Sequence, residues 1–231
     1  IFTVLERDRD VCSDVEERPF TIYAFDNETG AYLNGANVSF DCVNLFSCSL
    51  GRTAQVGGIA RLASLLPTFC APGSVVVEHQ DYVTVKQQLD RSADSIDVNL
   101  LPLRHLPLTV VKRTLTGNQV NKDEPLYSGE KALVFLTTDD VREFSSTTRF
   151  PFNKINENTG DITGEEAQRL GSIDVINADG ITYDLTIALL NDKNDLIGRI
   201  EMNWTPTKSD VEAATGAVLT VFEYVPHPTA T

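Results

Sequence analysis

The chain has 231 residues, of which 42% are hydrophobic and 23% are charged, so it can form one large or two ordinary globular domains with packed cores. Its formal net charge is -14. Contacts to a phosphate backbone need clustered lysines and arginines, which this acidic chain lacks, so nucleic acid is excluded as a partner.

The N-terminal arm, residues 1–19, begins at Ile1 and carries no signal-peptide pattern. The sequence contains no apolar run of about 18 residues or more, so we expect no transmembrane segment in this chain. We interpret the chain as a processed, mature protein or a fragment of a longer one.

Short segments rich in Val, Ile and aromatic residues, separated by turn residues, predict strands in the first half. They are Phe20–Asp26, Ala36–Cys42, Leu50–Val56, Ile59–Leu65, Ser74–Glu78, Val83–Gln88 and Ser95–Leu101. Gly57-Gly58 predicts a two-residue hairpin turn, because glycine adopts the positive φ angles that such turns require.

Two prolines around a short extended segment, from Leu101 to Pro107, predict a domain boundary. Strand signals then resume at Leu108–Thr114, Lys131–Thr137, Ser172–Ile176, Thr182–Leu190, Leu196–Trp204 and Ala217–Val225. In Leu196–Trp204 one set of alternating residues is apolar, which predicts one buried and one solvent-exposed face.

Helical signals are limited to Thr163–Leu170 and Ser209–Ala214, each long enough for only a turn or two. Regular strand spacing without interleaved helices predicts an all-β fold. We expect two tandem antiparallel β-sandwiches, transthyretin-like or immunoglobulin-like, with the second one covering residues 107–231.

The first half carries a set of turn and strand motifs. In chain order they are Thr21–Asp26, Glu28-Thr29-Gly30, Leu33–Val38, Thr53 before Gly57-Gly58, Leu65-Leu66-Pro67, Gly73–Val77, Asp81-Tyr82-Val83 and Ile96–Leu100. Over residues 20–101 this order resembles the carboxypeptidase regulatory-like family. The resemblance implies a transthyretin-like β-sandwich that serves as a non-catalytic accessory domain. Asp81 stands where the family usually has Gly, and the cysteines are additions to its pattern.

The four cysteines are Cys12, Cys42, Cys48 and Cys70. Their even number suits two disulfides with three connectivities, which would place the protein outside the cell or at its surface. A zinc site, which usually needs closely paired ligands that are absent here, and reduced core thiols are the alternatives. The resemblance implies that all four lie at one end of the first sandwich. This placement favours Cys42 bonded to Cys48 and Cys12 bonded to Cys70, and it leaves the other two connectivities open.

Catalytic motifs are not apparent. The three histidines, His79, His105 and His227, fall in a predicted turn, the boundary segment and a Pro-rich tail. None belongs to a zinc-protease helix, and neither a G-x-S-x-G elbow nor a phosphate-binding glycine loop occurs. A Cys70–His79 thiol–imidazole pair is less plausible than two exposed turn residues. We therefore expect no enzyme activity and no cofactor.

Two acidic loops, Asn191–Asp195 and Asp139-Asp140, offer closely spaced oxygen ligands without the register of an EF-hand. Solvated Asx turns explain them better, so we expect no metal site. Candidate glycosylation sequons occur at Asn27, Asn37 and Asn203. A Lys–Asn crosslink between Lys112 and Asn203 is not expected.

These features together favour a non-enzymatic structural subunit of an extracellular assembly, such as a pilus-like filament, a surface layer or an adhesin stalk. The alternative is a glycan- or protein-binding module of a larger secreted or membrane-anchored protein. We expect partners to be further copies or neighbouring surface chains. Two candidate strand-exchange segments are the apolar run Ile1, Phe2, Thr3, Val4 and Leu5, and Ala217–Val225. The alternative for both is pairing within their own chain.

Overall fold

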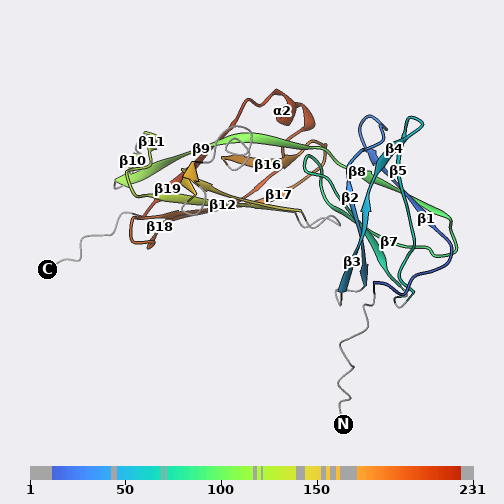
Figure 1. The fold of residues 1–231 in the computed structure, drawn as a ribbon. Helices are drawn as coiled ribbons and strands as arrows, with labels where there is room; N and C mark the ends of the chain where they lie inside the picture. Colours follow the sequence, from blue (N-terminus) through green and yellow to red (C-terminus); the bar gives the residue numbers. More distant parts are fainter. Residues whose placement is uncertain are drawn as a thin grey trace, which may run out of the picture. The chain divides into compact units, whose positions relative to one another are not determined.

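The computed structural model describes residues 12–42, 46–68, 70, 72–116, 119–120, 122–138, 144–151, 155–156, 160–161 and 171–224. Within these ranges the protein is built almost entirely of β-strands, with one short helix, α2 (Figure 1). The chain divides into two compact units, Ile1–Pro102 and Leu103–Thr231. No helix among the described residues is long and apolar enough to cross a membrane.

The described residues of the first unit form eight strands: β1 Phe20–Asp26, β2 Asn37–Cys42, β3 Phe46–Arg52, β4 Ala54–Val56, β5 Ile59–Ser64, β6 Ser74–Glu78, β7 Val85–Gln88 and β8 Ser95–Leu100. They form two four-stranded sheets, in the orders β4-β5-β1-β8 and β3-β2-β6-β7.

The core of this unit is supplied by alternate residues of both sheets. In β1, every second residue from Phe20 is buried. In β2, Val38 and Phe40 are buried in the same alternating way, and they join the β1 side chains in one hydrophobic cluster. Because successive strand residues point to opposite faces, this pattern leaves the other face of each sheet to solvent.

One predicted strand, Leu50–Val56, is wrong as a single element, because the chain changes sheets inside it. Residues up to Arg52 pair with β2, whereas Ala54–Val56 pair with β5. Thr53 lies between them and is buried, and its hydroxyl donates to the Leu33 carbonyl (2.6 Å) and accepts from the Ala36 amide (3.0 Å). The predicted Gly57-Gly58 hairpin turn is confirmed, since Val56 pairs with Ile59 and both glycines have positive φ.

The second unit contains β9 Leu103–Thr116, β10 Gln119–Val120, β11 Glu124–Pro125, β12 Lys131–Thr137, β13 Ser145–Phe150, β14 Ile155–Asn156, β15 Gly160–Asp161, β16 Ser172–Ile176, β17 Tyr183–Leu190, β18 Leu196–Trp204, α2 Lys208–Ala213 and β19 Ala217–Glu223. Its main sheet has the order β10-β9-β19-β18-β17-β12-β13, and β11 and β16 also pair with β9. Among the described residues, β14 and β15 pair only with each other.

The predicted boundary segment is the beginning of β9. Residues Leu103–Pro107 pair with β16, and the strand pairs with β19 from Leu108 onward. Pro107, which has no amide hydrogen, lies where β9 changes partners, and the next amide, that of Leu108, donates to the Gly171 carbonyl (3.0 Å). A proline can therefore stand within this strand without leaving a buried carbonyl unsatisfied.

The sequence pattern does not predict β13, because the inward side chains of this strand are hydroxyls and not apolar groups. Ser146 and Thr148 are buried and serve β16: the Thr148 hydroxyl donates to the Ser172 carbonyl (2.7 Å), and the Asp174 amide donates to the Ser146 hydroxyl (3.1 Å). In β18 the predicted buried face is only partly buried, since Met202 is 47% exposed. The predicted helical turn near Ser209 is α2, capped by Thr207, whereas Thr163–Leu170 lies outside the described residues.

Most pairs among the described strands are antiparallel, as expected, but two pairs are parallel. β1 and β8 pair in parallel from Thr21–Ser95 to Asp26–Leu100. β9 and β19 also pair in parallel, from Leu108–Ala217 to Thr114–Glu223. In each unit, therefore, a strand near the beginning of the unit lies directly beside its last strand.

Candidate functional site

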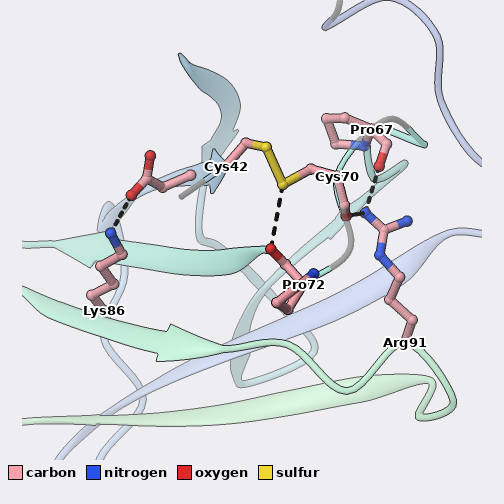
Figure 2. The surroundings of a disulfide bond; sticks show 7 residues. Cys42, Pro67, Cys70, Pro72, Lys86 and Arg91 are labelled. Atoms are coloured by element: carbon pink, nitrogen blue, oxygen red, sulfur yellow. Dashed lines mark hydrogen bonds and ion pairs between the residues drawn. A yellow bond between two sulfur atoms is a disulfide. The ribbon is translucent and has the colours of Figure 1, made fainter. Parts of the chain in front are cut away.

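Two disulfides close the first unit, and their connectivity differs from the expected one. Cys12 is bonded to Cys48 and Cys42 to Cys70, with Cα–Cα distances of 5.5 and 5.7 Å; Figure 2 shows the second bond. Cys48 is the register partner of Phe40, so Cys42 and Cys48 are diagonal neighbours on paired strands. Diagonal neighbours lie about 7–8 Å apart, beyond the usual disulfide range of about 4.4–6.8 Å, so the expected Cys42–Cys48 bond does not fit this register.

The two disulfide loops overlap along the chain. One closes residues 12–48 and the other closes residues 42–70. Both connect the β2–β3 pair to segments outside it, namely the N-terminal segment before β1 and the connection between β5 and β6. Every residue from Cys12 to Cys70 is consequently inside at least one covalent loop.

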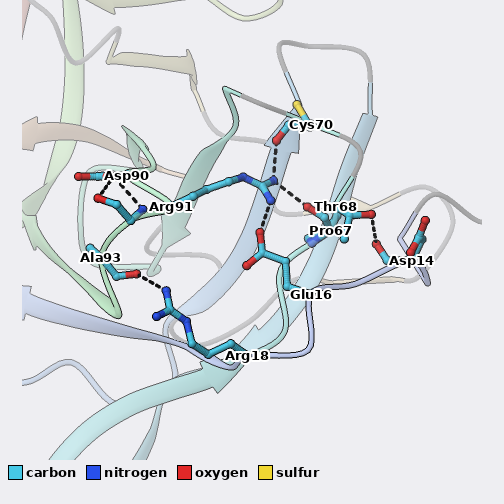
Figure 3. Close-up of polar contacts among 10 residues, drawn as sticks. Asp14, Glu16, Arg18, Pro67, Thr68, Cys70, Asp90, Arg91 and Ala93 are labelled. Atoms are coloured by element: carbon cyan, nitrogen blue, oxygen red, sulfur yellow. Dashed lines mark hydrogen bonds and ion pairs between the residues drawn. The ribbon is translucent and has the colours of Figure 1, made fainter.

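The Arg91 side chain, in the turn before β8, contacts the segment that carries Cys70 and the N-terminal segment (Figure 3). Its guanidinium forms an ion pair with Glu16 and donates to the carbonyls of Pro67 (2.7 Å) and Cys70. The guanidinium carbon also lies 5.5 Å from the centre of the Phe40 ring. Because this side chain is largely buried and reaches two carbonyls and a carboxylate, it connects the N-terminal segment to the Cys70 loop.

The N-terminal segment has further backbone connections beside Arg91. The Thr68 amide and hydroxyl both donate to the Asp14 carbonyl, at 2.9 and 3.2 Å. Arg18 donates to the Ala93 carbonyl (3.3 Å) and pairs with Asp94 at the surface, where ion pairs contribute little. The segment from Cys12 to Arg18 is thus bonded to two loops that follow much later in the sequence.

A buried charged cluster around Lys112 connects three segments of the second unit. The Lys112 ammonium is fully buried, lies 2.8 Å from Glu130 Oε1 and 3.0 Å from Glu223 Oε2, and stands 3.5 Å from the centre of the Tyr127 ring. Burial lowers the pKa of Lys112, but hydrogen bonds to Glu130 and Glu223 outweigh it, so this pKa lies above its ordinary value. The lysine is therefore charged and links β9, the turn before β12, and β19.

The contacts around this lysine extend to the turn that carries the aromatic ring. The Tyr127 amide donates to Glu130 Oε2 (2.7 Å), and its hydroxyl donates to Glu124 Oε2 (2.9 Å). The hydrogen bond to Glu124 raises the pKa of Tyr127. A sequence signal for the cluster did exist, because Lys112 continues the inward-facing alternation of Leu108 and Val110 in β9.

A crosslink between Lys112 and Asn203 was not expected. Lys112 contacts two carboxylates, whereas Asn203 lies exposed in β18 opposite Asp184. Among the other sequon asparagines, Asn27 lies exposed in the turn after β1. The side chain of Asn37, which is exposed at the start of β2, accepts a hydrogen bond from Arg52 Nε (2.7 Å).

The two described histidines lie in different units. His79 packs edge-on against the Tyr82 ring, 5.0 Å between centres, and Cys70 cannot act as its thiol partner because it is in a disulfide. His105 Nδ1 lies 2.5 Å from Asp174 Oδ1 across the β9–β16 pair. His227 lies outside the described residues.

The acidic loop Asn191–Asp195 is organised around its own backbone. The Asn191 side-chain oxygen accepts from the amides of Lys193 (2.9 Å) and Asp195 (2.8 Å), which is an Asx turn, and Asn194 has a positive φ. Across the described part of the chain, no group of three or more His, Cys, Asp or Glu side chains is placed to hold a metal ion. Asp139-Asp140 and Ile1–Leu5 lie outside the described residues.

Comparisons with known structures give pilin subunits among the structural neighbours. No family model and no curated protein matches the chain. The shaft pilin SpaA of Lactobacillus rhamnosus GG is 11% identical, with a TM-score of 0.26 over 92% of this chain and 98% of that one. A single-substitution mutant of the same shaft pilin reaches 0.28 at 11% identity, over 91% and 99%. BcpA, the major pilin subunit of Bacillus cereus, is 10% identical at 0.24, over 81% and 68%. At these TM-scores the similarity supports no conclusion about function.

Proposed function

We propose that this chain is a structural module of an extracellular assembly, made of two tandem β-sandwiches, and that it transmits tension along a filament or stalk. The parallel pairing of a first and a last strand in each unit carries this proposal. We also propose that residues 20–101 form a carboxypeptidase regulatory-like domain, which agrees with two four-stranded sheets around one core.

Parallel terminal strands resist extension because of the direction in which force acts on them. When the second unit is pulled at its two ends, tension enters β9 at Leu103 and leaves β19 after Glu223. Since the strands run in the same direction, this tension slides one past the other, and the ladder of seven register pairs must break together. Strands peeled apart from one end would lose their hydrogen bonds one at a time, which requires less force.

The charged cluster strengthens the same strand pair. Lys112 Nζ and Glu223 Oε2 connect β9 to β19 directly, and Glu130 binds the lysine from the turn before β12. Because this ion pair is buried, its attraction is screened less than that of a surface pair. Sliding β19 along β9 would leave the lysine without one of its counterions.

In the first unit the two disulfides determine which part of the chain carries the tension. The overlapping loops make residues 12–70 one covalent block, so tension passes through the bridges and reaches β8. β8 then slides along β1, which lies inside the block. Persistent disulfides are typical of oxidising, extracellular settings, which agrees with this location for the chain.

The test is single-molecule stretching of the complete chain in two geometries. Pulling from the two termini should require a high force to open the second unit. Pulling between a bio-orthogonal handle at Thr114 and the C-terminus loads the same β9–β19 pair from its two carboxyl ends and should open it at a much lower force. Equal forces in the two geometries would contradict the proposal. Negative-stain images of native material should in addition show ordered polymers.

The second candidate function is a glycan- or protein-binding accessory module. A partly exposed aromatic cluster, formed by Tyr23, Phe25 and Tyr32, favours it. A stable monomer that binds glycans and opens at low force would support this alternative over the tension-bearing module.

A further inference from the structure

The outer face of the sheet β4-β5-β1-β8 carries apolar and aromatic side chains in contact with solvent. This face, which we call the aromatic face, contains Tyr23, Phe25, Tyr32, Val56 and Ile59. The rings of Phe25 and Tyr32 lie 4.6 Å apart between centres, and Tyr23 lies 6.4 and 6.2 Å from them. Val56 is 57% exposed, and Ile59 and Tyr32 are each 38% exposed. Clustering of this kind marks an interaction surface more often than scattered apolar residues do.

Two opposite charges flank Tyr23 on this face. In register, Tyr23 is the partner of Arg61 in β5 on one side and of Asp97 in β8 on the other. Residues in register share a face of the sheet, and both charged side chains are exposed. Within the described part of the chain neither forms an ion pair, since Tyr23 stands between them and neighbouring strands lie about 4.8 Å apart.

We propose that the aromatic face binds a second copy of this chain, sheet against sheet, with its two-fold axis parallel to β1 beside Tyr23. Such an axis exchanges the two sides of the sheet. It therefore places Arg61 opposite Asp97 of the second copy, Asp97 opposite its Arg61, and the Tyr23 rings against each other. Two sheets packed in this way lie about 10 Å apart with nearly aligned strands.

The size of the face determines how tightly such a pair can bind. Four strands of three to seven residues give roughly 350 Å² of sheet area per copy, using the usual strand spacing and rise. A stable interface usually buries about 800 Å² per partner, so one such contact is weak. Repetition along an assembly would strengthen it, so this inference rests on the proposed structural function and adds the lateral contact between subunits.

The test uses the complete chain in sedimentation velocity runs over a wide concentration range. The wild type should form a reversible dimer. Arg61→Glu alone and Asp97→Arg alone should each remain monomeric, because each places like charges opposite one another twice. A mixture of these two variants should dimerise again, since every contact then joins opposite charges. Arg149→Glu, an exposed change in the second unit, should dimerise like the wild type.

A wild type that stays monomeric up to its solubility limit would overturn the proposal, as would single variants that still dimerise or a mixture that does not. Glycan binding by a monomeric wild type, lost in Tyr23→Ser, would also overturn it and identify the face as a sugar platform. Far-UV circular dichroism checks that each variant is folded. The stretching experiment on Arg61→Glu separates the two proposals, because the high unfolding force should remain even where dimerisation is lost.

Discussion

Lys112 and Glu223 form a buried ion pair of 3.0 Å between the first and last strands of the second unit, although they are not register partners. Lys112 lies opposite Val221, so Glu223 reaches it along the strand from two residues away. The second carboxylate, Glu130, approaches from the turn before β12. A single cation thus pairs with two carboxylates that come from segments far apart in the sequence.

Replacing Lys112 by Met should destabilise the second unit by about 3–5 kcal/mol, because both carboxylates lose their counterion while they remain partly buried. The triple variant Lys112→Met, Glu130→Gln, Glu223→Gln should lose clearly less, since no charge is then left unpaired. Trp204, the chain's one tryptophan, lies in β18 and reports unfolding of this unit by fluorescence in a urea titration. Glu201→Gln, at an exposed position, should change the stability by less than about 0.5 kcal/mol. A triple variant as unstable as the single one would contradict this assignment.

Stability of the first unit should fall in acid partly through Asp26. Burial raises the pKa of this carboxyl, but hydrogen bonds from the Thr29 amide, the Tyr82 hydroxyl and the Glu28 amide outweigh it and lower the pKa. A lowered folded-state pKa gives stability above the unfolded value of about 3.9, and this stability is lost as the pH falls through the folded-state value. Asp26→Asn should therefore be less stable than the wild type at pH 7, with a difference that shrinks below about pH 4.

Hydrogen exchange of the β1 amides, measured in both proteins at several pH values, checks this prediction. Asp184→Asn, an exposed substitution in β17, is the matched control and should leave exchange in β1 unchanged. A difference between wild type and Asp26→Asn that stays constant from pH 7 to pH 3 would exclude the carboxylate as its source.

Reduction should release a defined length of chain when the first unit is stretched. With both disulfides intact, the covalent path from Cys12 to Cys70 crosses both bridges and the short stretch from Cys42 to Cys48, although the two ends are 58 positions apart. About 50 residues are therefore hidden from force, which at about 3.5 Å per residue is roughly 180 Å.

The measurement compares the gain in length on opening this unit with and without reductant. Cys42→Ser with Cys70→Ser should release only about 16 of these residues, because the path then runs along the chain from Cys48 to Cys70, and reductant should release the remaining 36. The second unit contains none of the four cysteines, so its own gain in length serves as an internal control and should not change. An unchanged gain for the first unit after reduction would contradict the overlapping connectivity.

Gly73→Ala should destabilise the first unit by about 1–3 kcal/mol through overpacking. A Cβ atom at this position would stand 2.1 Å from the tip of the Phe40 ring, which is fully buried and supported by the surrounding core. Gly73→Ala should cost less stability in a Phe40→Leu background than in the wild type, because the shorter Leu side chain removes the clash. Denaturant unfolding, monitored through hydrogen exchange of the β6 amides, measures the interaction energy between the two sites. Strictly additive effects would contradict a direct clash.

Local sequence patterns determined where most strands lie. Alternation of apolar and polar residues located β1, β6 and β12, because burying one face of a sheet imposes a period of two whichever strands are neighbours. Gly57 and Gly58 determined their turn, since positive φ is a local requirement. The same logic misses β13, whose inward Ser146 and Thr148 bury hydroxyls, and it merges β3 with β4, where Thr53 changes sheets.

Only the tertiary structure decided which segments meet. The pairing of Cys42 with Cys70, the parallel ladders that join β1 to β8 and β9 to β19, and the two acids around Lys112 depend on strand order and register. Distance along the chain says nothing about these, because many strand orders bury the same apolar residues equally well. The positions of Arg61 and Asp97 on either side of Tyr23 arise in the same way, from three strands that are brought into register only when the sheet forms.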